Sequence, residues 1–216
     1  MKRLIFSTLS LVLFAASASA QSYFTPEFTK VYASTAAEQN GLVNFEAISF
    51  AGEVFSTGLQ IKNGWGKHSK NESLSFMGTN PAGLPDQDEY TNQNNDWLIS
   101  DVIDLSDAKD PVLSFDFLYN YGVDSTNTLG ILVCTGGYQS ATPQGNDPKA
   151  TPAGEWKTLK KAIYASAANT AEPMSFSLKD FAGQKIRIAF RATNRLQMNI
   201  NNSRLYEISN LEVKEK

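Results

Sequence analysis

The chain is poor in the residues on which disulfide scaffolds, zinc sites and many hydrolases depend. Its 216 residues include one cysteine, Cys134, and one histidine, His68. A single cysteine excludes a disulfide framework within the chain, and one histidine with one cysteine cannot supply the usual ligands of a zinc site. A serine–histidine or cysteine–histidine pair would have to use His68, which lies in a polar stretch that we interpret as a loop. We expect Cys134 to be buried in a strand rather than reactive.

Charge is also scarce, and a basic excess is missing. Charged residues make up 19% of the chain, below the roughly 25% usual for globular domains. The formal net charge is -3, which does not fit a nucleic-acid-binding protein. With 42% hydrophobic residues, the chain is not intrinsically disordered. No P-loop or dinucleotide-binding motif occurs.

Long apolar runs are missing except at the beginning of the chain. Lys2 and Arg3 precede an apolar stretch over residues 4–16, and small residues follow at 18–20, as signal peptidases require. The stretch is shorter than the roughly 20 residues that span a membrane. We interpret residues 1–20 as a cleaved signal peptide, with an N-terminal membrane anchor as the alternative. The product would be secreted, or held at the cell surface or in the periplasm, without a membrane span.

Cleavage would make the chain more acidic. It removes two of the 19 basic residues and none of the 22 acidic ones, so the net charge changes from -3 to -5.

Period-two patterns predict an all-β fold. Apolar and polar side chains alternate over residues 112–118 and 184–192, which is typical of strands with one face in a core. A continuous apolar run over 129–134 suits a central strand. Further candidate strands are 42–48, 58–62, 74–77, 97–99, 156–163 and 174–178. Short strands separated by Gly, Pro and Asn clusters predict an antiparallel jelly-roll β-sandwich.

We expect one sandwich domain over residues 42–216, preceded by an arm at 21–41 that is either loose or an added edge strand. The last strand, 206–213, changes phase at Ser209-Asn210, which predicts a β-bulge. Residues 179–183 are expected to form one tight turn. Asn63-Gly64 resembles a hairpin turn, followed by a loop over 65–69.

Several short motifs together resemble a known family. They are Asn95-Asp96-Trp97-Leu98-Ile99-Ser100, then Ile103-Asp104-Leu105-Ser106, Leu113-Ser114-Phe115, the stretches 138–159, 176–178, 181–186 and 188–191, and the final strand over 206–213. In this order and spacing they resemble the secreted choice-of-anchor J domains of Bacteroidetes-type bacteria, which are related to cleaved-adhesin and MAM-like modules. The match covers residues 42–214. It implies a galactose-binding-like or concanavalin-like sandwich, and binding or adhesion more than catalysis.

The resemblance also implies a structural calcium ion. Relatives often hold it between an early acidic residue and an Asp near the final strand. Glu46 matches the early position. Near the final strand, relatives usually carry an Asp-Asn pair, whereas this chain has Ser209-Asn210. Asp86 and Asp88 form the densest acidic cluster, either as calcium ligands or as solvated loop charge. The candidate ligands are Glu46, Asp86, Asp88 and Asn210.

Two long loops, 78–96 and 136–155, are the expected place for binding, because loops beyond about 15 residues are usually functional or disordered. Sugars bind against aromatic rings, while amides and carboxylates form hydrogen bonds with the sugar hydroxyl groups. We expect Trp97 and Trp156 in the core, whereas Trp65 is either a core residue or a binding platform. The candidate ligand-binding residues are Trp65, Tyr90, Tyr121, Tyr138, Asn146 and Asp147.

These patterns favour a non-catalytic module that binds an extracellular glycan or a surface protein. One alternative is a structural or assembly subunit, which would present an apolar patch or an open edge strand. A hydrolase is the other alternative. It would need two positioned carboxylates, and the Glu-x-Asp-x-x-Glu spacing of laminarinase-type sandwich enzymes does not occur in the chain.

The calcium expectation has a direct test. If an ion ties the loops together, a chelator should lower the melting temperature, because ligands that bind only the folded state stabilise it. Differential scanning fluorimetry with EDTA, and with EDTA plus excess calcium, measures this. An unchanged melting temperature would contradict the site.

Overall fold

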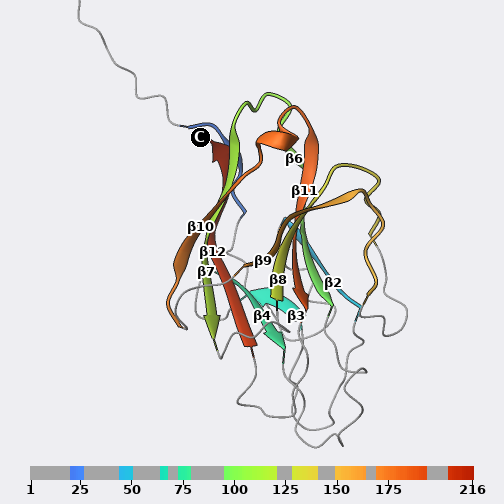
Figure 1. The fold of residues 1–216 in the computed structure, drawn as a ribbon, viewed down its shortest axis with the longest axis vertical. Coiled ribbons are helices and arrows are strands. Elements are labelled where there is room, and N and C mark those ends of the chain that lie inside the picture. Colours follow the sequence, from blue (N-terminus) through green and yellow to red (C-terminus); the bar gives the residue numbers. More distant parts are fainter. Residues whose placement is uncertain are drawn as a thin grey trace, which may run out of the picture.

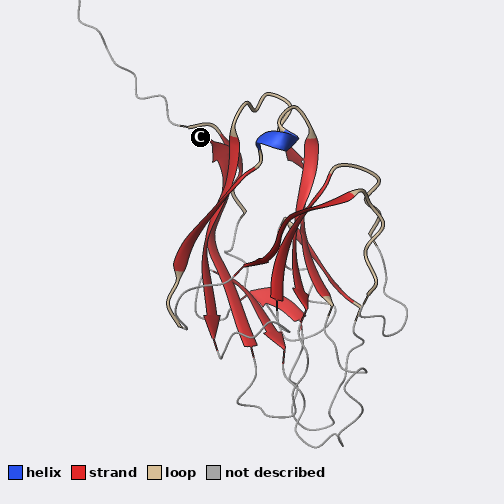
Figure 2. Ribbon diagram, in the orientation of Figure 1, coloured by secondary structure: helices blue, strands red, loops and turns tan. Residues whose placement is uncertain are grey.

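The chain folds as two facing antiparallel β-sheets (Figures 1 and 2), which confirms the predicted jelly-roll sandwich. The computed structural model describes residues 20–26, 44–50, 64–67, 73–78, 95–120, 128–140, 149–163, 169–193 and 204–216. The first sheet has the order β10 (Glu172–Ser177), β7 (Pro111–Asn120), β12 (Arg204–Glu215), β4 (Ser73–Gly78), β3 (Gly64–Lys67), and β1 (Ser22–Phe24) also pairs with β12. The second sheet has the order β2 (Phe45–Ser49), β5 (Asp96–Ser100), β11 (Lys185–Thr193), β8 (Thr128–Cys134), β9 (Trp156–Ile163), with β6 (Ile103–Asp104) paired to β11.

Many successive strands lie in opposite sheets, as a jelly roll requires. The chain passes from β4 in the first sheet to β5 in the second, and it crosses again between β9, β10, β11 and β12. Residues distant in the sequence are therefore neighbours within each sheet. A short 3-10 turn, η2 (Lys179–Phe181), precedes β11 where one tight turn was expected.

The main core lies between the sheets and follows the alternation of the strands. Phe115 and Phe117 of β7 face Phe190 of β11, and Phe115 meets Phe190 edge-on with ring centroids 5.3 Å apart. All three side chains are buried. Burial of a side chain of this size stabilises the fold by about 1.5–3 kcal/mol.

The predicted bulge in the last strand is confirmed. The register of β12 against β7 shifts between Ser209 and Glu212, and Asn210 has a positive φ of 51°. This extra residue lets Ile208 and Leu211 both face the core, although their spacing alone would put them on opposite faces.

Two strands differ from the sequence expectation. Gly64–Lys67, predicted as a turn and a loop, forms the edge strand β3 with Trp65 opposite Phe76. Two of its four residues are glycines, so the alternation of apolar and polar side chains that indicates a strand is missing. The two-residue strand β6 is too short to give any pattern. The candidate strand at 58–62 lies outside the described residues.

Part of the N-terminal arm is an edge strand. Strand β1 pairs with the end of β12, with Ser22 opposite Lys214. The Tyr23 hydroxyl donates to the Glu215 carboxylate at 2.8 Å, and the ring of Phe24 packs edge-on against that of Phe45 at 5.8 Å. The arm thus completes the sheet beside β12.

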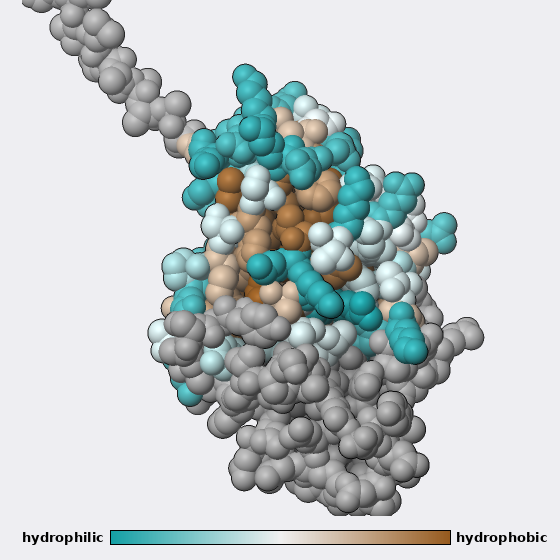
Figure 3. Space-filling model, in the orientation of Figure 1, coloured by the Kyte–Doolittle hydropathy of each residue, from teal (hydrophilic) through white to brown (hydrophobic). Residues whose placement is uncertain are grey.

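One side of the sandwich is closed by β3, which contacts both β2 and β5 of the other sheet. The strands β9 and β10 end the two sheets on the other side, where Leu159, Met174 and Phe176 are partly buried against the core. Figure 3 shows apolar surface exposed on one face of the molecule, framed by hydrophilic side chains. Among the residues described, no helix has the length and apolar character to cross a membrane.

The turn after β6 generates a prediction for acid stability. The hydroxyl of Ser106 donates to Asp104 at 2.5 Å and its backbone N–H at 3.0 Å, and Lys185 lies 3.1 Å away. These contacts lower the pKa of Asp104 from 3.8 to about 2. Because the pKa is lower in the folded chain, the stabilising contribution is complete above pH 3.8 and is lost as the pH falls toward 2.

We therefore expect Asp104→Asn to be less stable than the native chain at neutral pH. The difference in the free energy of unfolding should shrink between pH 4 and 2 in urea titrations, since the remaining acidic groups are common to both proteins. A difference that stays constant over this range would show that Asp104 is not the group responsible.

Candidate functional site

The outer face of the second sheet carries its own buried cluster. Outer strand faces are usually polar, yet here Ile48, Trp97, Ile99 and Ala189 pack together away from the main core. The register explains the grouping, because Ile48 lies opposite Trp97, and Ile99 lies opposite Ala189. Trp97 has no exposed surface. The expectation that Trp97 is buried is therefore confirmed, but it lies outside the space between the sheets.

This cluster is covered by the chain between β8 and β9. We call its described residues, 135–140 and 149–155, the cover segment. Its two ends pair by backbone hydrogen bonds: Thr135 N–H donates to Glu155 O at 3.1 Å, Glu155 N–H to Gly136 O at 2.8 Å, and Gln139 N–H to Ala153 O at 3.3 Å. The segment thus lies as a small hairpin against the sheet.

Arginine and aromatic side chains form a continuous stack beneath the cover segment. We call it the aromatic ladder. Arg191 lies over Trp97 at 5.1 Å, and Trp97 packs on Trp156 with centroids 5.1 Å apart. Trp156 meets Tyr138 edge-on at 6.1 Å, and Arg187 lies over Tyr138 at 4.8 Å. Cation–π and edge-to-face contacts of this kind each contribute about 0.5–1.5 kcal/mol.

Both indole N–H groups of the ladder and the Nε–H of Arg191 also have hydrogen-bond acceptors. The side-chain oxygen of Asn95 accepts hydrogen bonds from Trp97 Nε1 at 2.9 Å and from Arg191 Nε at 2.8 Å. Its amide nitrogen donates to Ala150 O of the cover segment at 2.7 Å. Trp156 Nε1 donates to Pro152 O at 2.9 Å. The cover segment and the ladder are therefore joined by hydrogen bonds as well as by packing.

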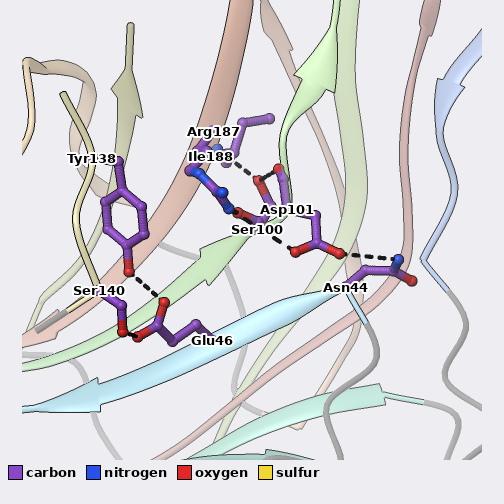
Figure 4. Close-up of polar contacts among 8 residues, drawn as sticks. All are labelled: Asn44, Glu46, Ser100, Asp101, Tyr138, Ser140, Arg187 and Ile188. Carbon is purple, nitrogen blue, oxygen red and sulfur yellow. Dashed lines mark hydrogen bonds and ion pairs between the residues drawn. The ribbon is translucent and has the colours of Figure 1, made fainter. Parts of the chain in front are cut away.

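At the edge of the ladder, two hydroxyl groups converge on one carboxylate (Figure 4). Tyr138 donates to Glu46 Oε2 at 2.5 Å, and the Ser140 hydroxyl donates to Glu46 Oε1. Burial and the hydrogen bond to Glu46 raise the pKa of Tyr138, so the phenol keeps its proton and remains a donor. The carboxylate of Glu46 is thereby held in one orientation.

A second set of polar groups lies nearby on β5 and β11. Arg187 Nη1 donates to Ser100 O at 2.7 Å and lies 4.0 Å from Asp101 Oδ1. Asn44 Nδ2 donates to Asp101 Oδ2 at 3.4 Å. The Asp101 side chain is 63% exposed and that of Arg187 26%. We call Asn44, Glu46, Asp101, Tyr138, Ser140 and Arg187 the polar cluster.

The structure brings together two of the predicted site residues, Glu46 and Tyr138, although they were assigned to different sites. The backbone of Trp65 lies in β3. Apart from Asn210, the other candidates lie outside the described residues: Asp86, Asp88, Tyr90, Tyr121, Asn146 and Asp147.

The predicted calcium ligands Glu46 and Asn210 lie in different sheets. Glu46 lies on the outer face of the second sheet, whereas Asn210 lies on the first sheet and donates to Asp116 at 2.6 Å. Asp116 alternates with the buried Phe115 and Phe117, so it points away from the other sheet. In the described part of the chain, no three His, Cys, Asp or Glu residues are grouped to hold a metal ion. A calcium site at Asp86 and Asp88 stays a prediction.

Sequence reasoning missed Arg187, Asp101, Asn44 and Ser140. Arg187 alternates with the core residues Ile186 and Ile188 and was expected on a solvent face. Its contact with Tyr138 depends on the cover segment crossing the sheet, which no local pattern reveals. The signals that pointed to this region were the length of the loop over residues 136–155, which contains Tyr138, and the family resemblance at Glu46.

Comparisons with known proteins found low similarity only. No family model matches the chain, and no curated protein matches it. Among solved structures, the K3 cleaved adhesin domain of Lys-gingipain from Porphyromonas gingivalis W83 is 14% identical with a TM-score of 0.47, over 91% of this chain and 100% of that one. The K2 domain of Lys-gingipain is 14% identical with a TM-score of 0.44, over 89% and 98%.

The carbohydrate-binding module TmCBM61, solved with β-1,4-galactotriose, is 11% identical with a TM-score of 0.41, over 91% of this chain and 100% of that one. None of these likenesses assigns a ligand to this chain. The ligand has to be inferred from the chain's own side chains.

The cover segment depends on a glycine. Gly154 has a φ of +149°, and a Cβ atom there would lie 2.8 Å from Cys134 Sγ and 3.1 Å from Trp156 Nε1. Gly183 has a φ of +79° but open space around it. Substitution at the two positions therefore distinguishes the cost of backbone strain alone from the cost of strain with steric overlap.

We expect Gly154→Ala to lower the free energy of unfolding by about 3 kcal/mol, because it adds overpacking to backbone strain. Gly183→Ala should cost only about 1–2 kcal/mol from its backbone conformation. Urea denaturation of both variants measures the difference. Equal losses would show that Gly154 does not pack closely on Cys134 and Trp156.

Proposed function

We propose that the chain is an exported, non-catalytic binding module that recognises an extracellular glycan through the polar cluster. The observation that carries the proposal is the convergence of Glu46, Tyr138 and Arg187 at the rim of the cover segment. Two carboxylates, a guanidinium, an amide and two hydroxyls lie together at the surface there. Sites for sugars combine such groups with aromatic side chains.

The chemistry of the cluster suits sugar hydroxyls. A sugar hydroxyl both donates and accepts, so it pairs well with a carboxylate on one side and a guanidinium on the other. Asp101 is the more exposed carboxylate, and its partners Asn44 and Arg187 hold it in place. Hydrogen bonds to charged groups are worth about 1.5–3 kcal/mol when a ligand forms them.

The aromatic ladder supports the proposal by fixing the cluster before a ligand arrives. Arg187 covers a face of Tyr138, and the phenol in turn fixes Glu46. Side chains held in this way lose little further freedom when a ligand binds. The role of Tyr138 is therefore to position Glu46 and to offer an aromatic edge, rather than to serve as an open stacking platform.

The hydrogen bonds of Glu46 favour binding over hydrolysis. Both its oxygens accept hydrogen bonds from hydroxyl groups of this chain. A catalytic carboxyl group needs an oxygen that faces the substrate, whereas both oxygens of Glu46 already have partners in this chain. Membership of the choice-of-anchor J family, export and a calcium ion at Asp86 and Asp88 are further parts of this proposal, and the order of the sequence motifs supports them.

The alternative of an assembly subunit would use an apolar patch, such as the surface in Figure 3, or an open edge strand. The edge strands β9 and β10 carry features that oppose the addition of another strand. Pro173 lies within β10 and lacks a backbone donor, and β9 carries the exposed lysines Lys157, Lys160 and Lys161. Proteins commonly protect sheet edges in these two ways. We therefore prefer the glycan, with a surface protein as the alternative partner.

The proposal predicts that the polar cluster, and not the opposite sheet, binds sugar. On an array of neutral, amino and acidic glycans, Glu46→Gln should weaken binding about tenfold or more, because a charged acceptor is lost. Tyr138→Phe should weaken it about two- to tenfold, because only the hydroxyl that positions Glu46 is removed.

Asp116→Asn is the matched control. It makes the same carboxylate-to-amide change on the other sheet, where Asn210 can still donate to it, and should bind like the native chain. Unchanged binding by Glu46→Gln, or no glycan bound by the native chain, would overturn the proposal. Release of reducing sugar from a bound glycan would instead show a hydrolase.

A further inference from the structure

We propose that the side of the sandwich between the edge strands β9 and β10 is a second binding site, which takes an acidic segment of another protein that also carries apolar side chains. The site consists of Leu159, Met174 and Phe176, which we call the open-side patch, and of Lys157 and Lys160 beside it. None of these residues belongs to the polar cluster. The inference therefore goes beyond glycan binding and does not depend on it.

The apolar side chains of β10 face the other sheet without being fully covered. Met174 lies opposite Phe115 of β7, and Phe176 lies opposite Leu113, and residues paired in this way share a face of the sheet. Phe176 also stacks on Phe115 with ring centroids 5.9 Å apart. The two β7 residues are buried, whereas the two on the edge strand keep part of their surface exposed. Figure 3 shows apolar surface between the two sheets on this side.

Two lysines of β9 face the same space. Lys157 lies opposite Val133 of β8, and Lys160 lies opposite Ile131. Both partners belong to the main core, so the lysines are on the inner face of their strand. A register shift at this point leaves Leu159 and Lys160 together opposite Ile131. Positive charge and apolar surface are therefore adjacent on the inner face of β9.

No carboxylate of the described residues neutralises these two charges. Lys157 Nζ lies 5.8 Å from the centre of the ring of Phe181. Within the described ranges, ion pairs are formed by other cations, such as Lys185 with Asp104 at 3.1 Å. The net charge of the chain is -3, so positive charge is not a general property of its surface.

The acidic residue of β10 lies away from this position. Glu172 begins the strand, opposite Phe117. Phe176 is near the other end, which leads into η2 and Phe181, where Lys157 lies. A carboxylate of a partner is therefore the group that the charges of the site fit.

Charge and apolar surface together indicate what covers the site. Burial of the open-side patch requires apolar side chains, and the lysines require acidic ones. A second copy of this chain does not meet the second requirement in a symmetric dimer, because the same surface would place Lys157 and Lys160 against their own equivalents. Pro173 in β10 opposes the addition of a strand. The partner segment therefore docks through its side chains.

A membrane or a polyanionic glycan fits the site less well. Proteins that bind membrane surfaces insert large apolar side chains, whereas those of the open-side patch are partly buried. Among the described residues, the exposed large hydrophobic one is Val102, which follows β5 and lies outside the patch. A polyanionic glycan would pair with the lysines but leave the patch uncovered. An acidic protein segment uses both parts of the site.

The test is selection of peptides from a random display library on the full native chain, with counter-selection on the double variant Lys157→Glu/Lys160→Glu. We expect the enriched peptides to combine Asp or Glu with Leu, Phe or Trp. Measured by fluorescence anisotropy, they should bind the native chain at least about tenfold more tightly than the double variant. Their affinity should fall as the salt concentration rises.

Lys161→Glu is the matched control. It makes the same charge change on the next residue of β9, whose side chain points to the other face, and it should bind the peptides like the native chain. Melting temperatures establish that each variant is folded. If the double variant is not, Lys157→Gln/Lys160→Gln replaces it, and equal binding by this variant and the native chain would contradict the proposal.

Three further results would overturn the proposal. The first is that no peptide distinguishes the native chain from the folded double variant. The second is a double variant that self-associates but still binds the peptides, which would show that the lysines only protect the edge of the sheet. The third is that the native chain sediments with phosphatidylglycerol vesicles and the double variant does not, which would assign the site to a membrane surface.

Discussion

The outer face of the second sheet depends on the buried side-chain amide of Asn95. Its oxygen accepts hydrogen bonds from Trp97 and Arg191, and its nitrogen donates to Ala150 of the cover segment. One amide, on a residue without exposed surface, therefore links β5, β11 and the cover segment. A buried polar group is tolerable only when its hydrogen bonds are made. Here those bonds also fix where the ladder begins and how the cover segment lies.

The second sheet consequently has apolar contacts on both faces. Strand β5 is buried at all five positions, with Leu98 in the main core and Trp97 and Ile99 in the outer cluster. A one-residue shift of register would move the side chains of each face to the other face, where they would not fit their neighbours. The groups at the end of β5, including Ser100 and Asp101, are thus presented from a rigid base. Such a base is what a binding surface requires if it is to keep its polar groups in place.

Strands whose side chains alternate were predictable from the sequence, and so was the bulge. The alternation over 112–118 and 184–192 corresponds to β7 and β11, and the phase change at Ser209-Asn210 corresponds to the observed register shift. These features are local, so a single segment contains the evidence. The glycine-containing strand β3 and the short β6 leave no such pattern.

The site was predictable only in part, because it is made by contacts between distant segments. Glu46 and Tyr138 are 92 positions apart, and both were identified, but as a metal ligand and a stacking residue. Their contact depends on where the cover segment crosses β2. Arg187 has the same alternation as any solvent-facing residue, so only the fold shows that it lies over Tyr138. Asn210, the other ligand that the resemblance implied, lies in the first sheet, where it donates to Asp116.

The close approach of Gly154 to Cys134 has a consequence for how the protein tolerates oxidants. Cys134 is 3% exposed and its thiol donates to Gly136 O at 3.2 Å, while Gly154 lies so close that a Cβ atom there would be 2.8 Å from the sulfur. Thiol–disulfide exchange requires access to the sulfur atom, and here the hairpin of the cover segment denies it. A chain that reaches an oxidising compartment with this lone thiol would therefore remain free of mixed disulfides and of covalent dimers for as long as the hairpin stays closed.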